Sequence, residues 1–101
     1  MYIKLFKNGQ IRIPKKFQLA LDFQVGNYLF IYESQNCIMI EKDHHDETLN
    51  QCLFALSRIS IPMELRRILD ISHSTPLSID VSSNNDILLI KKVGLENDTR
   101  I

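Results

Sequence analysis

The stretch RISIPMELRRILDI, residues 58–71, decides the fold because a second, altered copy of it occurs as QIRIPKKFQLALDF at residues 10–23. When the chain is compared with itself at an offset of 48, 11 of the 32 positions in 5–36 and 53–84 are identical. The identities are mostly apolar and the motif Ile-x-Ile-Pro is kept whole, so the sequence predicts an internal structural repeat. The identical pairs are Leu5/Leu53, Phe6/Phe54, Ile11/Ile59, Ile13/Ile61, Pro14/Pro62, Leu21/Leu69, Asp22/Asp70, Leu29/Leu77, Ile31/Ile79, Ser34/Ser82 and Asn36/Asn84.

The length of the chain limits how the two copies can fold. The 101 residues are 45% hydrophobic and 24% charged, which is typical of one globular domain. Each copy covers about 40 residues, which is too few to bury a stable core alone. We therefore expect the copies to share one core or to pair with copies in another chain. The sequence has no long apolar run, so we expect no secretory signal, no membrane span and a cytoplasmic protein.

Alternating and helical patterns give each copy the same order of elements. Strand-forming residues 2–6 and 10–13 flank Asn8-Gly9, which is a strong hairpin signal. A proline then favours the start of a short helix, and two further strands follow at 28–33 and 37–42. The second copy repeats this β-β-α-β-β order. The sequence therefore predicts a mainly β fold with a first repeat at 1–42, a linker at 43–51, a second repeat at 52–92 and a tail at 93–101.

The helical segments have predicted buried faces and predicted ends. Spacings of three and four residues place Leu65, Ile68 and Leu69 on one stripe of the second helix. The matching stripe of the first helix is Phe17, Ala20 and Leu21. We expect both helices to end at aspartates, Asp22 and Asp70, because aspartate tolerates the left-handed backbone conformation better than most residues.

The potential metal ligands are few. Cys37 and Cys52 fit no metal spacing, and we expect buried free thiols. Two adjacent histidines in the tract DHHDE, residues 43–47, rarely converge on one ion without a further fixed ligand. We therefore expect a solvated linker there, with neither a metal nor a cofactor.

The formal net charge of zero hides a charge pattern. Residues 1–21 carry five basic residues and no acid, whereas residues 22–57 carry six acids and one lysine. Residues 58–67 are again basic, with three arginines and one glutamate. The positive charge thus falls in the same section of both copies, which favours a basic face for an anionic partner. The alternative is an ordinary mixed surface.

The second copy resembles the signature of the AbrB/MazE/SpoVT domain family, whose typical run is Gly-Arg-(β)-x-Ile-Pro-x-Glu-Leu-Arg-Arg-x-Leu-Gly-Ile. The match is specific over residues 52–92 and degraded but legible over 2–42. The resemblance implies a swapped-hairpin β-barrel, in which two copies of the domain exchange hairpins. Because one chain supplies both copies here, it implies an intramolecular pseudo-dimer or a dimer of chains.

The resemblance also implies a function: a bacterial DNA-binding transcriptional regulator, with double-stranded DNA as partner. In this sequence Arg58 matches the arginine of the Gly-Arg turn, and Arg66 and Arg67 match the paired helix arginines. The first copy has Gln10, Gln18 and Leu19 at those places. Further candidates for DNA contact, which would partly compensate in the first copy, are Lys7, Arg12, Lys15 and Lys16.

Two alternative functions remain open at this point. The apolar residues Phe17, Leu19 and Phe23 could form a protein-contact patch, which would suit an interaction module that binds another regulator, a related AbrB-type chain or a second copy. An antitoxin of a toxin–antitoxin pair is the other alternative. We expect no enzyme, because the sequence has no glycine-rich phosphate loop and no nucleophile elbow.

Overall fold

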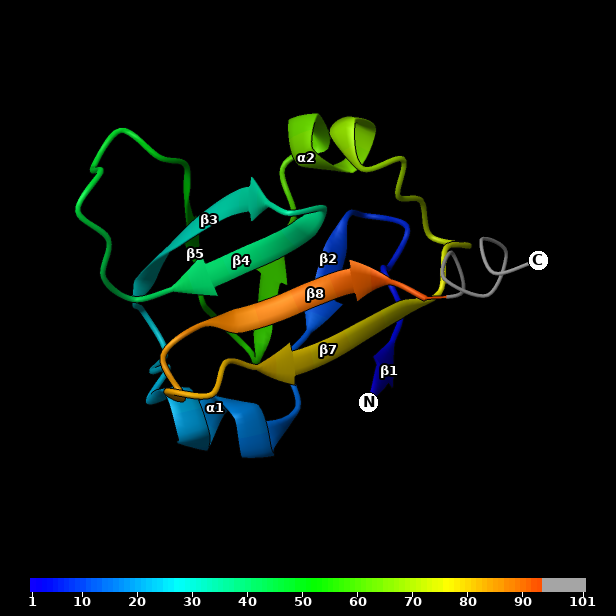
Figure 1. The fold of residues 1–101 in the computed structure, drawn as a ribbon. Helices are drawn as coiled ribbons and strands as arrows, with labels where there is room; N and C mark the ends of the chain where they lie inside the picture. Colours follow the sequence, from blue (N-terminus) through cyan, green and yellow to red (C-terminus); the bar gives the residue numbers. More distant parts are fainter. Residues whose placement is uncertain (94–101) are drawn as a thin grey trace.

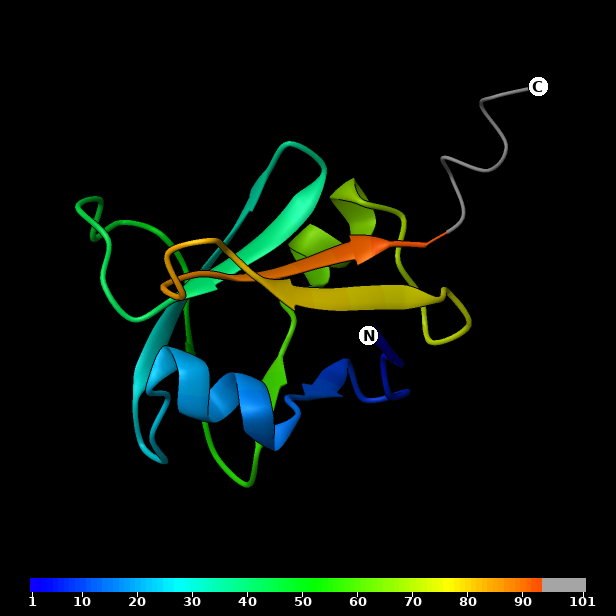
Figure 2. The same ribbon diagram turned by 60° about the horizontal axis from the view of Figure 1, so that its bottom comes forward.

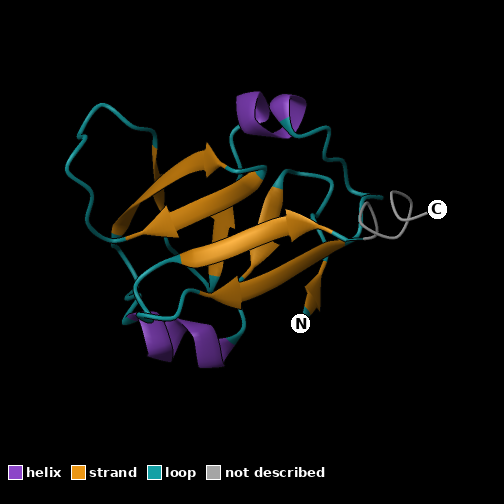
Figure 3. Cartoon of the chain, in the orientation of Figure 1, coloured by secondary structure: helices purple, strands orange, loops and turns teal. Residues whose placement is uncertain are grey.

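Antiparallel strands are the main regular secondary structure of the protein in a computed structural model that describes residues 1–93 (Figures 1 and 3). The prediction of a mainly β fold with two short helices is confirmed. In Figure 1 the two helices lie on opposite sides of the strands. The elements in chain order are β1 Tyr2–Ile3, β2 Gln10–Arg12, α1 Lys15–Leu21, β3 Tyr28–Ser34, β4 Cys37–Glu41, β5 Gln51–Leu53, β6 Arg58–Ser60, α2 Met63–Ile68, β7 Leu77–Val81 and β8 Leu88–Lys92.

The two halves of the chain are interleaved in the sheets. Six strands form one sheet in the order β1-β7-β8-β4-β3-β5, and β2 pairs with β6 in a separate ribbon. Strand β1 of the first half therefore pairs with β7 of the second, and β5 of the second half pairs with β3 of the first. Equivalent residues face each other at two places, Ile11 opposite Ile59 and Met39 opposite Leu89. These registers relate the halves by an approximate two-fold axis.

The sheets do not close into a barrel within residues 1–93, contrary to the expectation. The β1–β2 connection is bonded at Phe6, whose N–H donates to the Gln10 carbonyl at 2.8 Å and whose carbonyl accepts from the Gly9 N–H at 2.9 Å. The β5–β6 connection is bridged between Ala55 and Arg58 alone. Beyond these bonds β1 diverges from β2 and β5 from β6, so β1 and β5 stay as edges of the six-stranded sheet. Figure 2 shows from a second side that the N-terminus lies beside β7, the partner strand of β1.

One hydrophobic core draws on both halves. Ile11 and Ile59, which face each other in the ribbon, are 0% and 1% exposed. Alternate residues of β3, β4, β7 and β8 supply most of the remainder, as expected for strands that bury one face. The other fully buried side chains are Phe54, Ile13, Leu29, Ile31, Ile38, Ile40, Leu77, Ile79, Leu88 and Ile90.

The first strands of the two halves are shifted by one residue relative to the sequence alignment. Leu5 and Phe54 are buried at 3% and 1%, whereas Phe6 and Leu53 are exposed at 38% and 46%. The cause is the turn length. The first hairpin turns through Lys7–Gly9 and the second through Leu56 and Ser57 alone. Leu5 thus occupies the place of Phe54, so the aligned pairs Leu5/Leu53 and Phe6/Phe54 are not structural equivalents.

The predicted aspartates have left-handed φ angles, 55° at Asp22 directly after α1 and 54° at Asp70, two residues after α2 ends at Ile68. The buried faces differ from the prediction. Ala20 and Ile68 are exposed, and Ile68 retains 60% of its surface. Instead Gln18 is buried and Arg66 is half-buried. Phe17, Leu21, Leu65 and Leu69 are buried as predicted, and each of the two polar side chains donates a hydrogen bond to a strand carbonyl.

The predicted linker is partly anchored, contrary to the expectation of a solvated tract. The side chain of His44 is 16% exposed, and its ring lies 5.0 Å from that of Tyr32. Its Nδ1 accepts a hydrogen bond from the Asp46 N–H at 2.9 Å. Residues 94–101, most of the predicted tail, lie outside the described residues. No helix within residues 1–93 is long and apolar enough to cross a membrane.

Candidate nucleic-acid interface

The outer side of the β2–β6 ribbon carries the polar residues Gln10, Arg12, Arg58 and Ser60, which we call the ribbon face. Strand alternation turns Ile11 and Ile59 inward and these four residues outward. Arg12 is exposed and Arg58 is half-buried. The ribbon face is thus built from both halves of the chain.

The register of the ribbon places two arginines directly opposite each other. Arg12 pairs with Arg58, and Gln10 pairs with Ser60. Under the repeat offset Arg12 corresponds to Ser60 and Arg58 to Gln10, so both arginines lie at one end and both neutral residues at the other. Neither arginine forms an ion pair with a carboxylate of residues 1–93.

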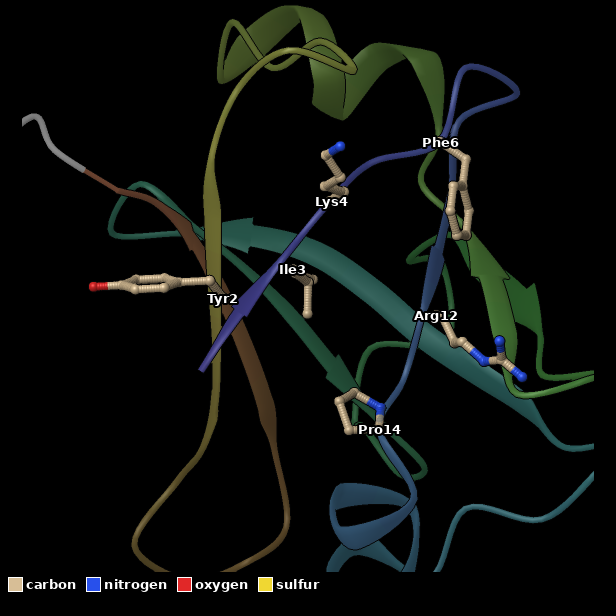
Figure 4. A pocket seen from close by; sticks show the side chains of 6 residues that line it. All are labelled: Tyr2, Ile3, Lys4, Phe6, Arg12 and Pro14. Atoms are coloured by element: carbon tan, nitrogen blue, oxygen red, sulfur yellow. The ribbon is translucent and has the colours of Figure 1, made fainter.

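The ring of Phe6 contacts one of these two arginines, Arg58. The Arg58 guanidinium carbon lies 4.9 Å from the centre of the Phe6 ring, in a cation–π contact. Phe6 and Arg12 also line a hollow of about 400 Å³ between β1 and β2, together with Lys4 (Figure 4). The corresponding hollow between β5 and β6 has Ala55, Ser60 and Leu53 in their places. Because the equivalent hollow forms without them, the fold does not require a cation or an aromatic ring in the hollow between β1 and β2.

Arg66 has a structural role that the sequence analysis missed. Its Nε donates a hydrogen bond to the Ile61 carbonyl at 3.0 Å, and its guanidinium lies against Gly9. At the equivalent position, Gln18 donates from Nε2 to the Ile13 carbonyl at 2.7 Å. Both side chains satisfy the last strand carbonyl before the proline, which has no sheet partner. The sequence signal for this role was the Ile-Pro pair, which occurs in both copies and leaves a strand carbonyl before the proline in each.

A second group of cations lies at the α2 end of the ribbon. Lys7, Arg66 and Arg67 line one depression of about 290 Å³, together with Asp70 and His73. Lys7 comes from the hairpin of the first half and the two arginines come from the helix of the second. Lys7 therefore joins the second-half arginines and does not compensate for their absence in the first half.

The remaining basic candidates lie on the first turn of α1. Lys15 and Lys16 are exposed, and Lys16 Nζ lies 5.1 Å from the centre of the Phe17 ring. The proposed contact patch beside them is wrong for two of its three members. Phe17 and Phe23 are 8% and 5% exposed and belong to the core, whereas Leu19 is 72% exposed. For Phe17 this agrees with the buried stripe that the helical spacing predicted.

Several ionisable groups away from the ribbon have clear partners. Lys42 Nζ lies 3.0 Å from an Asp22 oxygen, and this hydrogen bond lowers the pKa of Asp22. Burial, with the Glu41 carboxylate that accepts the Tyr32 hydroxyl at 2.6 Å, raises the pKa of Tyr32 to about 12.

Both cysteines of the described chain are free thiols. Burial raises the pKa of Cys52 to about 11, which keeps it a thiol at neutral pH. Cys37 is also free but only half-buried, which differs from the prediction. Within residues 1–93, no group of three or more histidine, cysteine or acidic side chains is placed to hold a metal ion.

Comparisons with known proteins add no relative to this picture. The chain matches no protein-family model, and searches of curated proteins and of solved structures gave no significant match.

Proposed function

We propose that this chain is a bacterial, cytoplasmic DNA-binding transcriptional regulator without enzymatic activity, and that its two halves form an AbrB-like pseudo-dimer with exchanged hairpins. The ribbon face and the exposed sides of α1 and α2 would contact DNA. The proposal unites the sequence resemblance with the interleaved pairing of β1 with β7 and of β5 with β3.

The observation that carries this proposal is the grouping of cations from both halves around one ribbon. Arg12 and Arg58 lie at one end, and Lys7, Arg66 and Arg67 lie at the other. Phe6 borders both groups, since its ring contacts Arg58 and also lines the α2 depression. Arginine forks suit phosphates and guanine edges, and binding by such groups releases counterions from DNA.

The α1 helix suggests the substitutions that test this function. Replacing Arg66 with glutamine and Arg67 with leucine gives α2 the residues that α1 has at those places, Gln18 and Leu19. A glutamine there keeps the bond to the strand carbonyl, as it does in α1. The double variant should therefore fold normally. It should bind DNA from upstream of its own gene more weakly, and its salt dependence should be shallower by about one to two units of log K per log salt.

The measurement is fluorescence anisotropy on upstream and scrambled DNA across a range of salt concentrations. Lys91→Gln is the matched control, because Lys91 is exposed on β8 and alternates away from the buried side of the sheet. It should leave the affinity nearly unchanged. Failure of the parent protein to bind either DNA at low salt would refute the proposed function.

The exposed surface beside β5 favours a second candidate function, self-association. Val25, Tyr28, Leu53 and Leu56, here the apolar corner, are 77%, 64%, 46% and 84% exposed. Tyr28 and Leu53 are direct partners across β3 and β5, and the N–H of Gly26 bonds the Phe54 carbonyl at 2.9 Å. Leu56 also has a left-handed φ of 54°, which is unfavourable for leucine.

The two edges of the six-stranded sheet differ in how well their residues prevent pairing with a further strand. The β1 edge has Lys4, Pro76 and His73 where the β5 edge has Leu53, Tyr28 and Val25. Lysine and proline are residues that prevent edge strands from pairing. The backbone groups of Gln51 and Leu53 point away from β3, since those of their neighbours bond toward it. A second copy of the chain could pair there, with Gln51 opposite Leu53 of that copy.

Light scattering after size exclusion tests this association. The parent should form a dimer as its concentration rises, and Leu53→Lys should remain monomeric. Leu19→Lys, which changes an exposed leucine on α1, should dimerise like the parent. A parent that stays monomeric at every concentration, or a Leu53→Lys variant that still dimerises, would contradict the association.

A further inference from the structure

We propose that Arg12 and Arg58 form a clamp for one phosphate group, present once in the chain, which makes the molecule bind DNA in a single orientation. The identity of the ligand as DNA rests on the proposed function. The binding of a phosphate-like anion by this pair does not, and it can be measured without DNA.

The first argument is the position of the two charges. Arg12 and Arg58 are direct cross-strand partners in an antiparallel ribbon, so their Cβ atoms are about 5 Å apart and their side chains leave the same face. Like charges directly opposite each other destabilise a strand pair. Among residues 1–93 no carboxylate forms an ion pair with either arginine to relieve that repulsion. A bound anion would relieve it.

The second argument is the way in which Arg58 is held. Its guanidinium lies over the Phe6 ring at 4.9 Å, and the side chain is half-buried. A guanidinium that is already positioned loses less freedom when it binds an anion. Arginine also offers two parallel N–H donors to a phosphate, which gives a fixed geometry as well as charge. The clamp thus combines one supported arginine with one exposed partner, Arg12.

The third argument is the comparison between the two ends of the ribbon. The approximate two-fold axis passes through the Ile11–Ile59 pair and relates the Arg12–Arg58 end to the Gln10–Ser60 end. The buried side of the ribbon does not distinguish the two ends, because its inward residues Ile11 and Ile59 are identical and lie at the axis. The outward chemistry of the two ends differs, with two cations at one end and two neutral residues at the other. The Arg12–Arg58 pair thus has no counterpart on the ribbon face at the other end, where the neighbouring cations Lys7, Arg66 and Arg67 belong to the α2 depression. The two ends therefore offer different contacts to phosphates, and the bound DNA would have a defined polarity.

The first experiment follows thermal unfolding at pH 7 in sodium phosphate and in sodium chloride at equal ionic strength. Arg12→Ser and Arg58→Gln introduce the residues found at the equivalent positions, Ser60 and Gln10. Lys91→Gln serves as the charge control. Phosphate also stabilises folded proteins generally, and this effect acts on all variants alike. The clamp adds a stabilisation that increases with phosphate concentration as a bound ligand does.

The parent and Lys91→Gln should show this additional stabilisation, and Arg12→Ser and Arg58→Gln should lose it. In chloride, Arg12→Ser should be at least as stable as the parent, because the repulsion between the two arginines is removed. An equal response to phosphate in the parent and in Arg12→Ser would overturn the clamp. A lower stability of Arg12→Ser in chloride would overturn the argument from repulsion.

The second experiment neutralises the phosphates of the bound DNA one at a time with methylphosphonate linkages. One position should weaken binding by the parent about tenfold, as expected for the loss of a charge-assisted contact. The same substitution should have little effect on Arg12→Ser. Equal sensitivity at two symmetry-related phosphates would overturn the single orientation. If the protein binds no DNA but its response to phosphate depends on Arg12, the clamp stands and the proposed function fails.

Discussion

Replacing Ile59 with alanine should lower the free energy of unfolding by about 3 kcal/mol. Ile59 is 1% exposed and faces Ile11 across the ribbon, at the axis that relates the two halves. The substitution removes three buried carbons and leaves a cavity in a core to which both halves contribute. Close-packed surroundings relax only partly into such a cavity. For a domain of this size, such a loss is a large fraction of a stability of roughly 5–15 kcal/mol.

Urea denaturation followed by circular dichroism measures this loss. The matched control is Ile68→Ala, which removes the same atoms from a side chain that is 60% exposed on α2. It should change the free energy of unfolding by less than about 0.5 kcal/mol. Unfolding should remain a single transition in both variants, because one core cluster contains residues of both halves. Two separate transitions, or equal losses in the two variants, would contradict a shared core centred on the ribbon.

Replacing Gly9 with alanine should lower the free energy of unfolding by about 2–3 kcal/mol. Two effects add. Gly9 has a left-handed φ of 84°, which costs an alanine roughly 1–2 kcal/mol. An added Cβ would also lie 2.9 Å from Cζ of Arg66, so the guanidinium must move and strain its bond to the Ile61 carbonyl. A weakened hydrogen bond of this kind accounts for about 1 kcal/mol.

Gly26→Ala separates these two effects. Gly26 has a similar φ of 93°, but an added Cβ there meets nothing within 4 Å. Its replacement should therefore cost only the backbone effect, about 1–2 kcal/mol. In an Arg66→Gln background, Gly9→Ala should become about as mild as Gly26→Ala, because the shorter side chain leaves room for the Cβ. Chemical denaturation of the parent, the three single variants and the Arg66→Gln/Gly9→Ala double variant gives the comparison. Equal losses at both glycines in the parent would show that Arg66 does not crowd Gly9.

Local chemistry explains why parts of the fold could be predicted from the residues alone. The Asn8-Gly9 turn and the left-handed helix ends at Asp22 and Asp70 depend on the preferences of individual residues, and each occurs where expected. The repeated order of strands and helices follows from hydrophobic periodicity, which is also a local property. These features need no knowledge of what the strands later pack against.

Errors arose where a neighbour distant in sequence decides the outcome. Spacing placed Ile68 in the buried stripe of α2, but Ile68 is exposed, and Arg66 on the other flank of the stripe is half-buried and bonded to the Ile61 carbonyl. The suggested contact patch likewise failed at Phe17 and Phe23, because the core covers both side chains, as the helical spacing had indicated for Phe17. The one-residue shift that buries Leu5 depends on turn length, which identity between the copies could not reveal.

The sequence by itself determined that the chain is a repeat of mainly β halves, that its turns and helix ends lie where they do, and that positive charge gathers in the same section of each half. Only the tertiary structure decided which cations meet. Arg12 and Arg58 are 46 positions apart and become neighbours through the register of the ribbon, just as Lys7 joins Arg66 and Arg67. The physical reason is that composition and periodicity act within a segment, whereas strand register and helix rotation are set by packing between segments.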